Sequence, residues 1–199
     1  MNWKKIVSLS VIFLTGCAPT VTPDSTISSH AIPKTAKIRT ASEMSSWTIT
    51  GALAAKNKTD AWTASIHWTQ NGPNNYKIHL FGPLGGGSIL IENKNGVITY
   101  QDPQKRIKSH NAESLMYQQT GIRIPIQDLY YWVRGLPAPG TVKSADHDSS
   151  QNLTYLEQAG YAIKYINYTN RNGINLPSKI HVSGPKGNLK IIIKRWENH

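Results

Sequence analysis

The sequence predicts a mainly β domain, folded as an incomplete antiparallel β-barrel with a helical lid. Segments that alternate apolar and polar residues recur along the chain and are separated by turn residues, a pattern typical of antiparallel strands. Two short amphipathic helices interrupt this pattern, and two such helices cannot cover both faces of a large sheet. A strongly curved sheet with the helices laid across its mouth would bury the apolar faces of both.

The chain begins with an export signal. Two lysines precede an apolar run over residues 6–14, which is too short to cross a bilayer as a stable helix. Residues 14–17 read Leu-Thr-Gly-Cys, which looks like a bacterial lipobox, where the thiol becomes the attachment point for lipid. We therefore predict a signal peptide over 1–16 and a lipidated Cys17. The alternative is that Cys17 follows an ordinary signal by chance.

Composition limits the chemistry that remains after this signal. Cys17 is the only cysteine, so the domain has no disulfide, thiolate metal site or cysteine nucleophile. The formal net charge of +11 falls to about +9 when Lys4 and Lys5 leave with the signal, and such a basic surface suits nucleic acid, anionic phospholipid or an acidic protein. Export and the scattered positions of the basic residues argue against nucleic acid. A membrane surface or an acidic partner remains, with plain solubility as the simpler explanation.

A flexible tether is predicted between the anchor and the folded domain. Residues 17–46 are rich in Ser, Thr and Pro after the cysteine and contain no aromatic residue, so they have little to bury. The composition changes at Trp47, where aromatic residues and strand-like segments begin, and we place the start of a half-barrel domain there, over 47–199.

The first half of this domain is predicted to form an antiparallel meander. A turn at Asn71–Asn74 and a hairpin at Lys94-Asn95-Gly96 separate alternating segments. The predicted strands cover 47–53, 61–70, 76–80, 88–92 and 97–100.

The middle of the chain is predicted to be helical. Asn111 can cap a helix that ends at Gly121, and Pro125 suits the first position of a second helix that ends at Gly135. Strands then return over 153–157, 161–168, 179–182 and 189–196.

Catalytic equipment is not apparent, and we expect neither an enzyme nor a cofactor. His147 between Asp146 and Asp148 is interpreted as part of a solvated polar loop. His67 and His79 can approach across a hairpin, but two histidines do not complete a metal site.

The loop over 81–87 stands out because five of its seven residues are Gly or Pro. Leu84 is its most isolated apolar residue. It either folds back into the core or projects outward, as an apolar tip that touches lipid or a partner.

An apolar stripe follows one face of the predicted strands. Such a stripe is ordinarily core, but in a half-closed barrel it could also line a pocket for a lipid chain. The candidate lining residues, with three from the second helix, are Trp62, Ile66, Trp68, Ile78, Leu80, Ile89, Ile91, Leu129, Trp132 and Val133.

The chain resembles the LolB family of outer-membrane lipoproteins, which receive other lipoproteins from the periplasmic carrier LolA. The most specific segment is Trp-Val-Arg-Gly-Leu-Pro over 132–137, followed by Gly-Pro-Leu-Gly over 82–85. The resemblance also rests on residues 47–51, 67–70 and 120–126. It covers essentially the whole mature domain. One departure is the run of three glycines after Leu84.

The resemblance implies an incomplete barrel whose apolar cavity, under a helical lid, holds acyl chains. It also implies that Leu84, with Pro83 and Gly85, helps pass cargo into the membrane. The expected partners are a LolA-like carrier, the acyl chains of cargo lipoproteins and outer-membrane phospholipid, with a monomer as the expected state.

Placement at the outer membrane, facing the periplasm, agrees with Ala18, because the Asp that typically retains lipoproteins at the inner membrane is missing there. Two alternatives remain open. The same half-barrel could carry another lipid or a glycolipid, or a filled barrel could be purely structural.

Overall fold

A computed structural model describes residues 40–83, 86–185 and 187–199. The predicted signal peptide, Cys17 and most of the predicted tether therefore lie outside the described residues, as do Leu84 and Gly85. The described part contains a 3-10 turn, eleven strands and two α-helices. None of its helices combines the length and apolar character needed to span a membrane.

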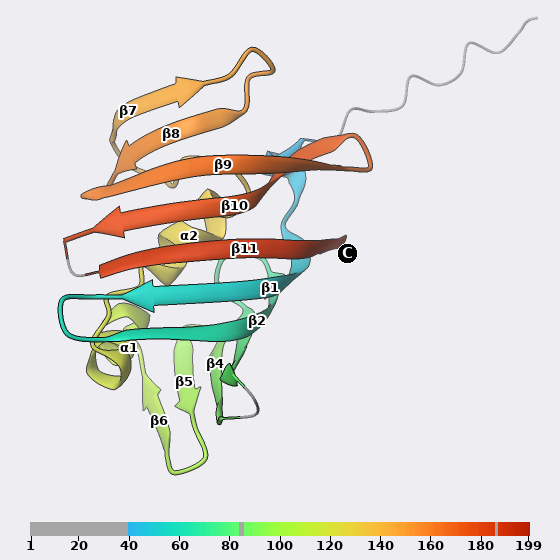
Figure 1. Cartoon of the computed structure of the whole chain (residues 1–199). Coiled ribbons are helices and arrows are strands. Elements are labelled where there is room, and N and C mark those ends of the chain that lie inside the picture. The colour runs from blue at the N-terminus through green and yellow to red at the C-terminus, as the bar shows by residue number, and fades with distance from the viewer. Residues whose placement is uncertain (1–39, 84–85, 186) are drawn as a thin grey trace, which may run out of the picture. The chain divides into compact units, whose positions relative to one another are not determined.

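The strands form one antiparallel sheet, ordered β6-β5-β4-β3-β2-β1-β11-β10-β9-β8-β7 (Figure 1). The first meander contains β1 (Ser46–Lys56), β2 (Ala61–Asn71), β3 (Tyr76–Phe81), β4 (Ser88–Lys94), β5 (Val97–Gln101) and β6 (Arg106–Ser109). The second contains β7 (Val142–His147), β8 (Leu153–Gln158), β9 (Tyr161–Arg171), β10 (Ile174–Gly184) and β11 (Gly187–Asn198). Because β1 pairs with β11, the two meanders join in the middle of the sheet, and β6 and β7 are its unpaired edges. The unclosed antiparallel sheet with two helices confirms the predicted fold class.

The helices connect these two edge strands and lie on one face of the sheet (Figure 1). Helix α1 (Ala112–Thr120) begins after Asn111, whose side chain accepts a hydrogen bond from the Ser114 backbone, and it ends at Gly121 in the left-handed conformation. Helix α2 (Ile126–Trp132) starts one residue later than predicted, because Pro125 is its N-cap.

Alternation sets which side chains face the helices. In β2 the even-numbered residues from Ala64 to Gln70 are buried, while their neighbours are exposed or half-buried. A bulge at Lys194 interrupts this order in β11, opposite Thr50 and Gly51 of β1, and shifts the buried phase from Ile193 to Trp196. A Cβ at Gly51 would lie 1.9 Å from the Ile192 carbonyl oxygen, so only glycine fits this close approach.

An aromatic cluster anchors the centre of the sheet beneath α2. The Trp47 ring lies edge-on to Trp68 at 5.0 Å and to Trp196 at 5.5 Å, and stacks on Tyr130 at 6.3 Å. The folded unit begins before Trp47, the predicted first residue of the domain, since Met44 is only 4% exposed.

Three strand predictions differ from the structure. Strand β6 was not expected, and Asp146 and His147, interpreted as part of a polar loop, lie on edge strand β7. Both strands are short and mostly exposed, so they have no buried face to generate alternation. Strand β10 starts earlier than predicted because irregular register on either side of Lys179 accommodates Pro177 within it.

Candidate functional site

The space between the sheet and the helices is entirely apolar and almost closed. Its cavity has a volume of about 30 Å³, room for only a few water molecules. The sheet contributes the floor and the helical segment the roof. The lining residues are Leu53, Ile66, Trp68, Ile78, Leu80, Ile91, Leu189 and Ile191 from the strands, with Met116, Ile124, Ile126 and Leu129 above them.

The predicted lining residues divide into three groups. Six of them meet in this interior: Ile66, Trp68, Ile78, Leu80, Ile91 and Leu129. Trp62 and Ile89 are half-buried and lie at an open groove beside it. Trp132 and Val133 are fully buried but are not part of the lining.

Sequence reasoning missed half of the interior. Leu53, Leu189 and Ile191 come from the central pair β1 and β11, and their alternation could have identified them. Met116 belongs to α1, Ile124 to the segment between the helices, and Ile126 to the first turn of α2. Their contact with the sheet depends on how the helices fold back, which no local pattern reports.

An open groove of about 790 Å³ leads to this interior. Its walls come from the start of β2, the β3–β4 loop, the β5–β6 turn and the end of α1, and they include Trp62 of β2 and Thr120 of α1. Leu80 lines both the groove and the closed cavity, so the groove reaches the apolar interior at this residue. We refer to it as the entrance groove.

The β3–β4 loop borders the entrance groove and is held by its own backbone. Gly82 donates to the Gly87 carbonyl at 3.0 Å, and Gly86 donates to the Pro83 carbonyl at 3.0 Å. Phe81, at the base of the loop, is 44% exposed, and Pro83 is exposed and lines the groove. These bonds draw the two described sides of the loop together into a narrow neck.

Polar groups mark the rim of the entrance groove. The Tyr100 hydroxyl donates to the Asp102 carboxylate at 3.1 Å, and burial together with this bond raises the pKa of Tyr100 to about 12. Backbone N–H groups of Gln104 and Lys105 hold the pKa of Asp102 below its usual value. Asp102 therefore stays ionised and solvated at the rim while the apolar surface lies further in.

The two helices are attached differently. Trp132 on α2 donates to the Gln158 side-chain oxygen of β8 at 3.0 Å, and this buried amide also exchanges two hydrogen bonds with the backbone of Ala138. At the end of α1, the Asn57 amide from the β1–β2 hairpin donates to the Gly121 carbonyl at 2.9 Å. The α2 attachment is buried, whereas the α1 attachment lies at the entrance.

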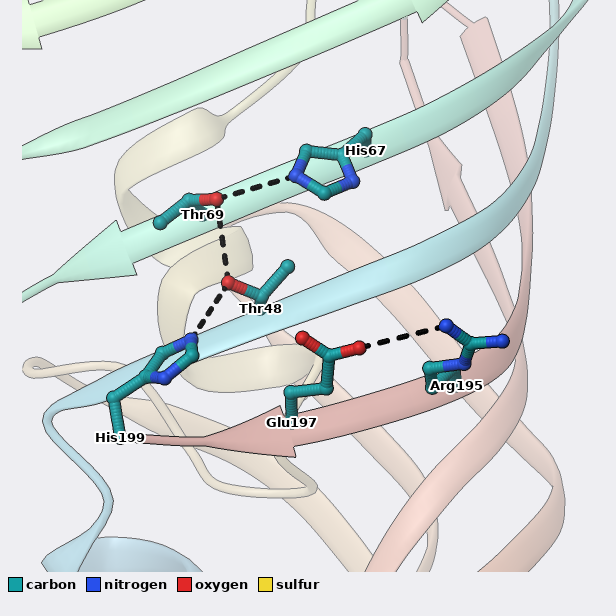
Figure 2. A network of polar contacts seen from close by, with 6 residues as sticks. All are labelled: Thr48, His67, Thr69, Arg195, Glu197 and His199. Carbon is teal, nitrogen blue, oxygen red and sulfur yellow. Dashed lines mark hydrogen bonds and ion pairs between the residues drawn. The ribbon is translucent and has the colours of Figure 1, made fainter.

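The predicted histidine pair lies on the outer face, the face of the sheet opposite the helices. His67 and His79 are direct partners in the β2–β3 register. In Figure 2, Thr48 links Thr69 of β2 to His199 at the chain end, at 3.2 and 3.0 Å, which ties β11 to β1 and β2. Within the described residues, no three His, Cys, Asp or Glu side chains gather where they could hold a metal ion.

Comparison with solved structures agrees with this fold. A LolA superfamily protein from Nitrosomonas europaea superposes with a TM-score of 0.51 at 11% identity, covering 79% of this chain and 87% of that one. A DUF1329 family protein from Desulfovibrio piger gives 0.52 at 7% identity, with the same coverage of each chain. At these identities the likeness concerns the fold alone.

Sequence comparison identifies the family. The chain is 32% identical to an outer-membrane lipoprotein LolB of Coxiella burnetii, over 96% of this chain and 91% of that protein. It is 32% identical to one from Nitrosococcus oceani, over 99% of both. The family described as outer membrane lipoprotein LolB matches residues 45–196. The chain therefore belongs to the LolB family of outer-membrane lipoproteins.

Proposed function

We propose that this protein accepts lipoproteins from a LolA-like periplasmic carrier and inserts them into the outer membrane. The observation that carries the proposal is the apolar interior, which meets the entrance groove at Leu80 beside the β3–β4 loop. In this function the interior receives the acyl chains of the cargo, and the transfer requires no covalent step.

The closed interior implies that the lid moves before cargo enters. A volume of about 30 Å³ holds no acyl chain, so the roof must separate from the sheet. We assign this movement to α1 and residues 121–125, because α2 is fixed to β8 by the buried Gln158 bonds. Movement of α1 away from the sheet would extend the entrance groove inward past Leu80.

A gradient of affinities can drive the transfer without chemical energy. Each CH₂ group removed from water contributes about 0.8 kcal/mol, whichever apolar site receives it. Net transfer between two cavities therefore depends on small differences in how well each one surrounds the chains. The bilayer is the final and most favourable acceptor.

The β3–β4 loop is the proposed delivery element, with Leu84 as its membrane-touching tip and Pro83 and Gly85 beside it. Exposed Phe81 and Pro83 support this role, since Pro83 gives the neck an apolar surface at the groove and Phe81 gives it one on the outer face beside His79. At the other end of the chain, we propose lipid attachment at Cys17 and a tether that lets the domain turn over the membrane.

Replacing Leu84 with Glu tests delivery separately from uptake. Because a carboxylate at the bilayer interior costs a few kcal/mol, we expect insertion of cargo into vesicles to fall at least about tenfold. Uptake from the loaded carrier and the unfolding midpoint should stay unchanged. The matched control is Val97→Glu, which puts the same charge at an exposed apolar position of the β4–β5 hairpin. Normal insertion by L84E would remove the loop from the mechanism.

Two alternative functions predict different results in lipid extraction and in dye binding. A carrier of another lipid would yield free phospholipid or glycolipid on extraction, and no protein-linked acyl chains. A purely structural protein would bind no apolar dye in competition with lipid, because its interior would remain closed.

A further inference from the structure

A cluster of basic side chains lies on the outer face across three neighbouring strands. His181 of β10 is paired in register with Lys164 of β9 on one side and with Lys190 of β11 on the other. Lys179 lies two residues before His181 on the same strand. These residues form an unbroken basic row, which we call the lysine row.

Neutralising partners are missing from the lysine row. In the described parts of the chain, none of its three lysines lies within 4 Å of a carboxylate, although ion pairs occur nearby at Arg195–Glu197 and Lys143–Glu157. His181 Nε2 is buried and has no hydrogen-bond partner among the described residues. Burial and the surrounding ammonium groups lower the pKa of His181. Like charges held together without a counter-charge favour binding of an anion.

A hollow of about 460 Å³ adjoins the lysine row. Small side chains, including Ala54, Thr63 and Ser183, leave the space open, and Lys56, Lys190 and His181 also line it. Residues 61–63 line both this hollow and the entrance groove, so the two depressions lie next to each other on either side of the start of β2. The basic surface therefore continues to the place where cargo would enter and leave.

Apolar side chains accompany the charge. Ile192, which pairs with Lys179, is 37% exposed, and Ile166 of β9 is 45% exposed. Trp62, which lines both the hollow and the entrance groove, is half-buried. Lysines, exposed isoleucines and a tryptophan together match the boundary of a bilayer, where phosphates lie above hydrocarbon and indole rings settle between them.

We propose that the lysine row and its hollow bind the phosphates of anionic phospholipids and so turn the entrance groove toward the bilayer. The inference rests on the proposed function, in that it assigns a membrane contact to the same delivery step. The proposal assigns the anionic phospholipid surface as the partner of the domain's positive charge. It also places a second contact beside the β3–β4 loop, at the same end of the sheet.

The test follows Trp62 in the full lipoprotein reconstituted into vesicles. Trp62 is a selective reporter, since the other tryptophans of the described residues are at most 6% exposed, namely Trp47, Trp68, Trp132 and Trp196. Its fluorescence is measured with a nitroxide on the lipid headgroup. Vesicles contain either phosphatidylcholine alone or about one-third phosphatidylglycerol, which supplies the anionic surface.

We expect stronger quenching in phosphatidylglycerol vesicles, and a loss of this difference in the double variant Lys164→Gln/Lys190→Gln. The ratio of docked to undocked protein should fall about fivefold for each lysine removed. The control Lys105→Gln/Lys108→Gln removes the same charge near β6 and should behave as the unmodified protein.

Other outcomes decide against the proposal or against the function on which it rests. Equal quenching in both vesicle types, or quenching unaffected by K164Q/K190Q, would overturn the docking site. A drop in cargo uptake by K164Q/K190Q without vesicles would also overturn it, since the row would then bind the carrier. Normal docking by an unmodified protein that takes up no cargo would support the docking site and refute the proposed function.

Discussion

Arg134 shows how one buried charge can join distant parts of the fold. It is 3% exposed, and its Nε donates to the Tyr130 carbonyl at 2.9 Å. Its Nη1 donates to the Met44 carbonyl at 2.7 Å, and the guanidinium lies 4.0 Å from the Tyr130 ring centroid. Burial lowers the pKa of Arg134, but carbonyl dipoles and the aromatic face compensate the charge. The side chain thereby holds the segment before β1 against α2.

Replacing Arg134 with Met should lower the free energy of unfolding by about 2–4 kcal/mol, because buried carbonyls lose their donors. Arg134→Lys should recover only part of this loss, since an ammonium cannot reproduce the planar fork. Urea unfolding of both variants measures the effect. A change below about 0.5 kcal/mol in R134M would show that the segment before β1 is held by other contacts.

From the sequence, Arg134 is recognised only as part of the 132–137 segment that resembles the family, and no structural role is predicted for it. Its partner Met44 is 90 residues away, and no local pattern reports such a contact. By contrast, Asn111 and Gly121 were predicted as caps because capping depends on residues within one turn.

At the scale of elements, the two helices of the lid are held by different contacts. Gln158 holds α2 through buried bonds, while Asn57 reaches the end of α1 from the rim of the sheet. The Asn57 oxygen also accepts the backbone N–H groups of Thr59 and Asp60, at 2.8 and 2.6 Å. One side chain thus shapes the β1–β2 hairpin and ties it to α1.

Asn57→Asp keeps the hairpin acceptor but removes the donation to Gly121, and it also places a second carboxylate beside that of Asp60. We expect faster uptake of an apolar dye, with a loss of about 1–3 kcal/mol in stability from the repelled carbonyl. Stopped-flow dye fluorescence measures the rate. The matched control is Asn170→Asp, which keeps its bond from Gly173 and loses its donation to Asn175 far from the lid. Equal dye rates in N57D and the unmodified protein would show that α1 is not the moving part.

Elements were predictable from the sequence where one face is buried. The long strands β2 and β11 show their alternation clearly, and the predictions found them. Strands β6 and β7 were missed because, as short edges, they bury little. The first half of β10 was not predicted because it contains Pro177, which ordinarily argues against a strand. The register irregularity that accommodates this proline has no signature in the sequence.

For the whole molecule, the pairing of β1 with β11 joins the two meanders and explains why the helices lie between two open edges of the sheet. The edges β6 and β7 remain apart, and the chain between them supplies both helices. The roof of the apolar interior is therefore continuous in the chain with both edge strands. A few hydrogen bonds, at Gln158 and Asn57, attach it to the sheet, and the rest of the contact is apolar packing. Alternation could predict the apolar face, but the closure to about 30 Å³ depends on packing between distant elements.

Photo-crosslinking from inside the lid tests the central claim, that acyl chains of transferred lipoproteins enter this interior. A diazirine analogue of leucine replaces Leu129, which is 4% exposed and lines the interior, and in a control protein it replaces Ile192 on the outer face. Each protein is mixed with LolA-type carrier loaded with lipoprotein, irradiated and digested for mass spectrometry. We predict crosslinks to cargo acyl chains from position 129 and none from position 192. Transfer of cargo without crosslinks at 129, or with equal crosslinks at both positions, would contradict the account.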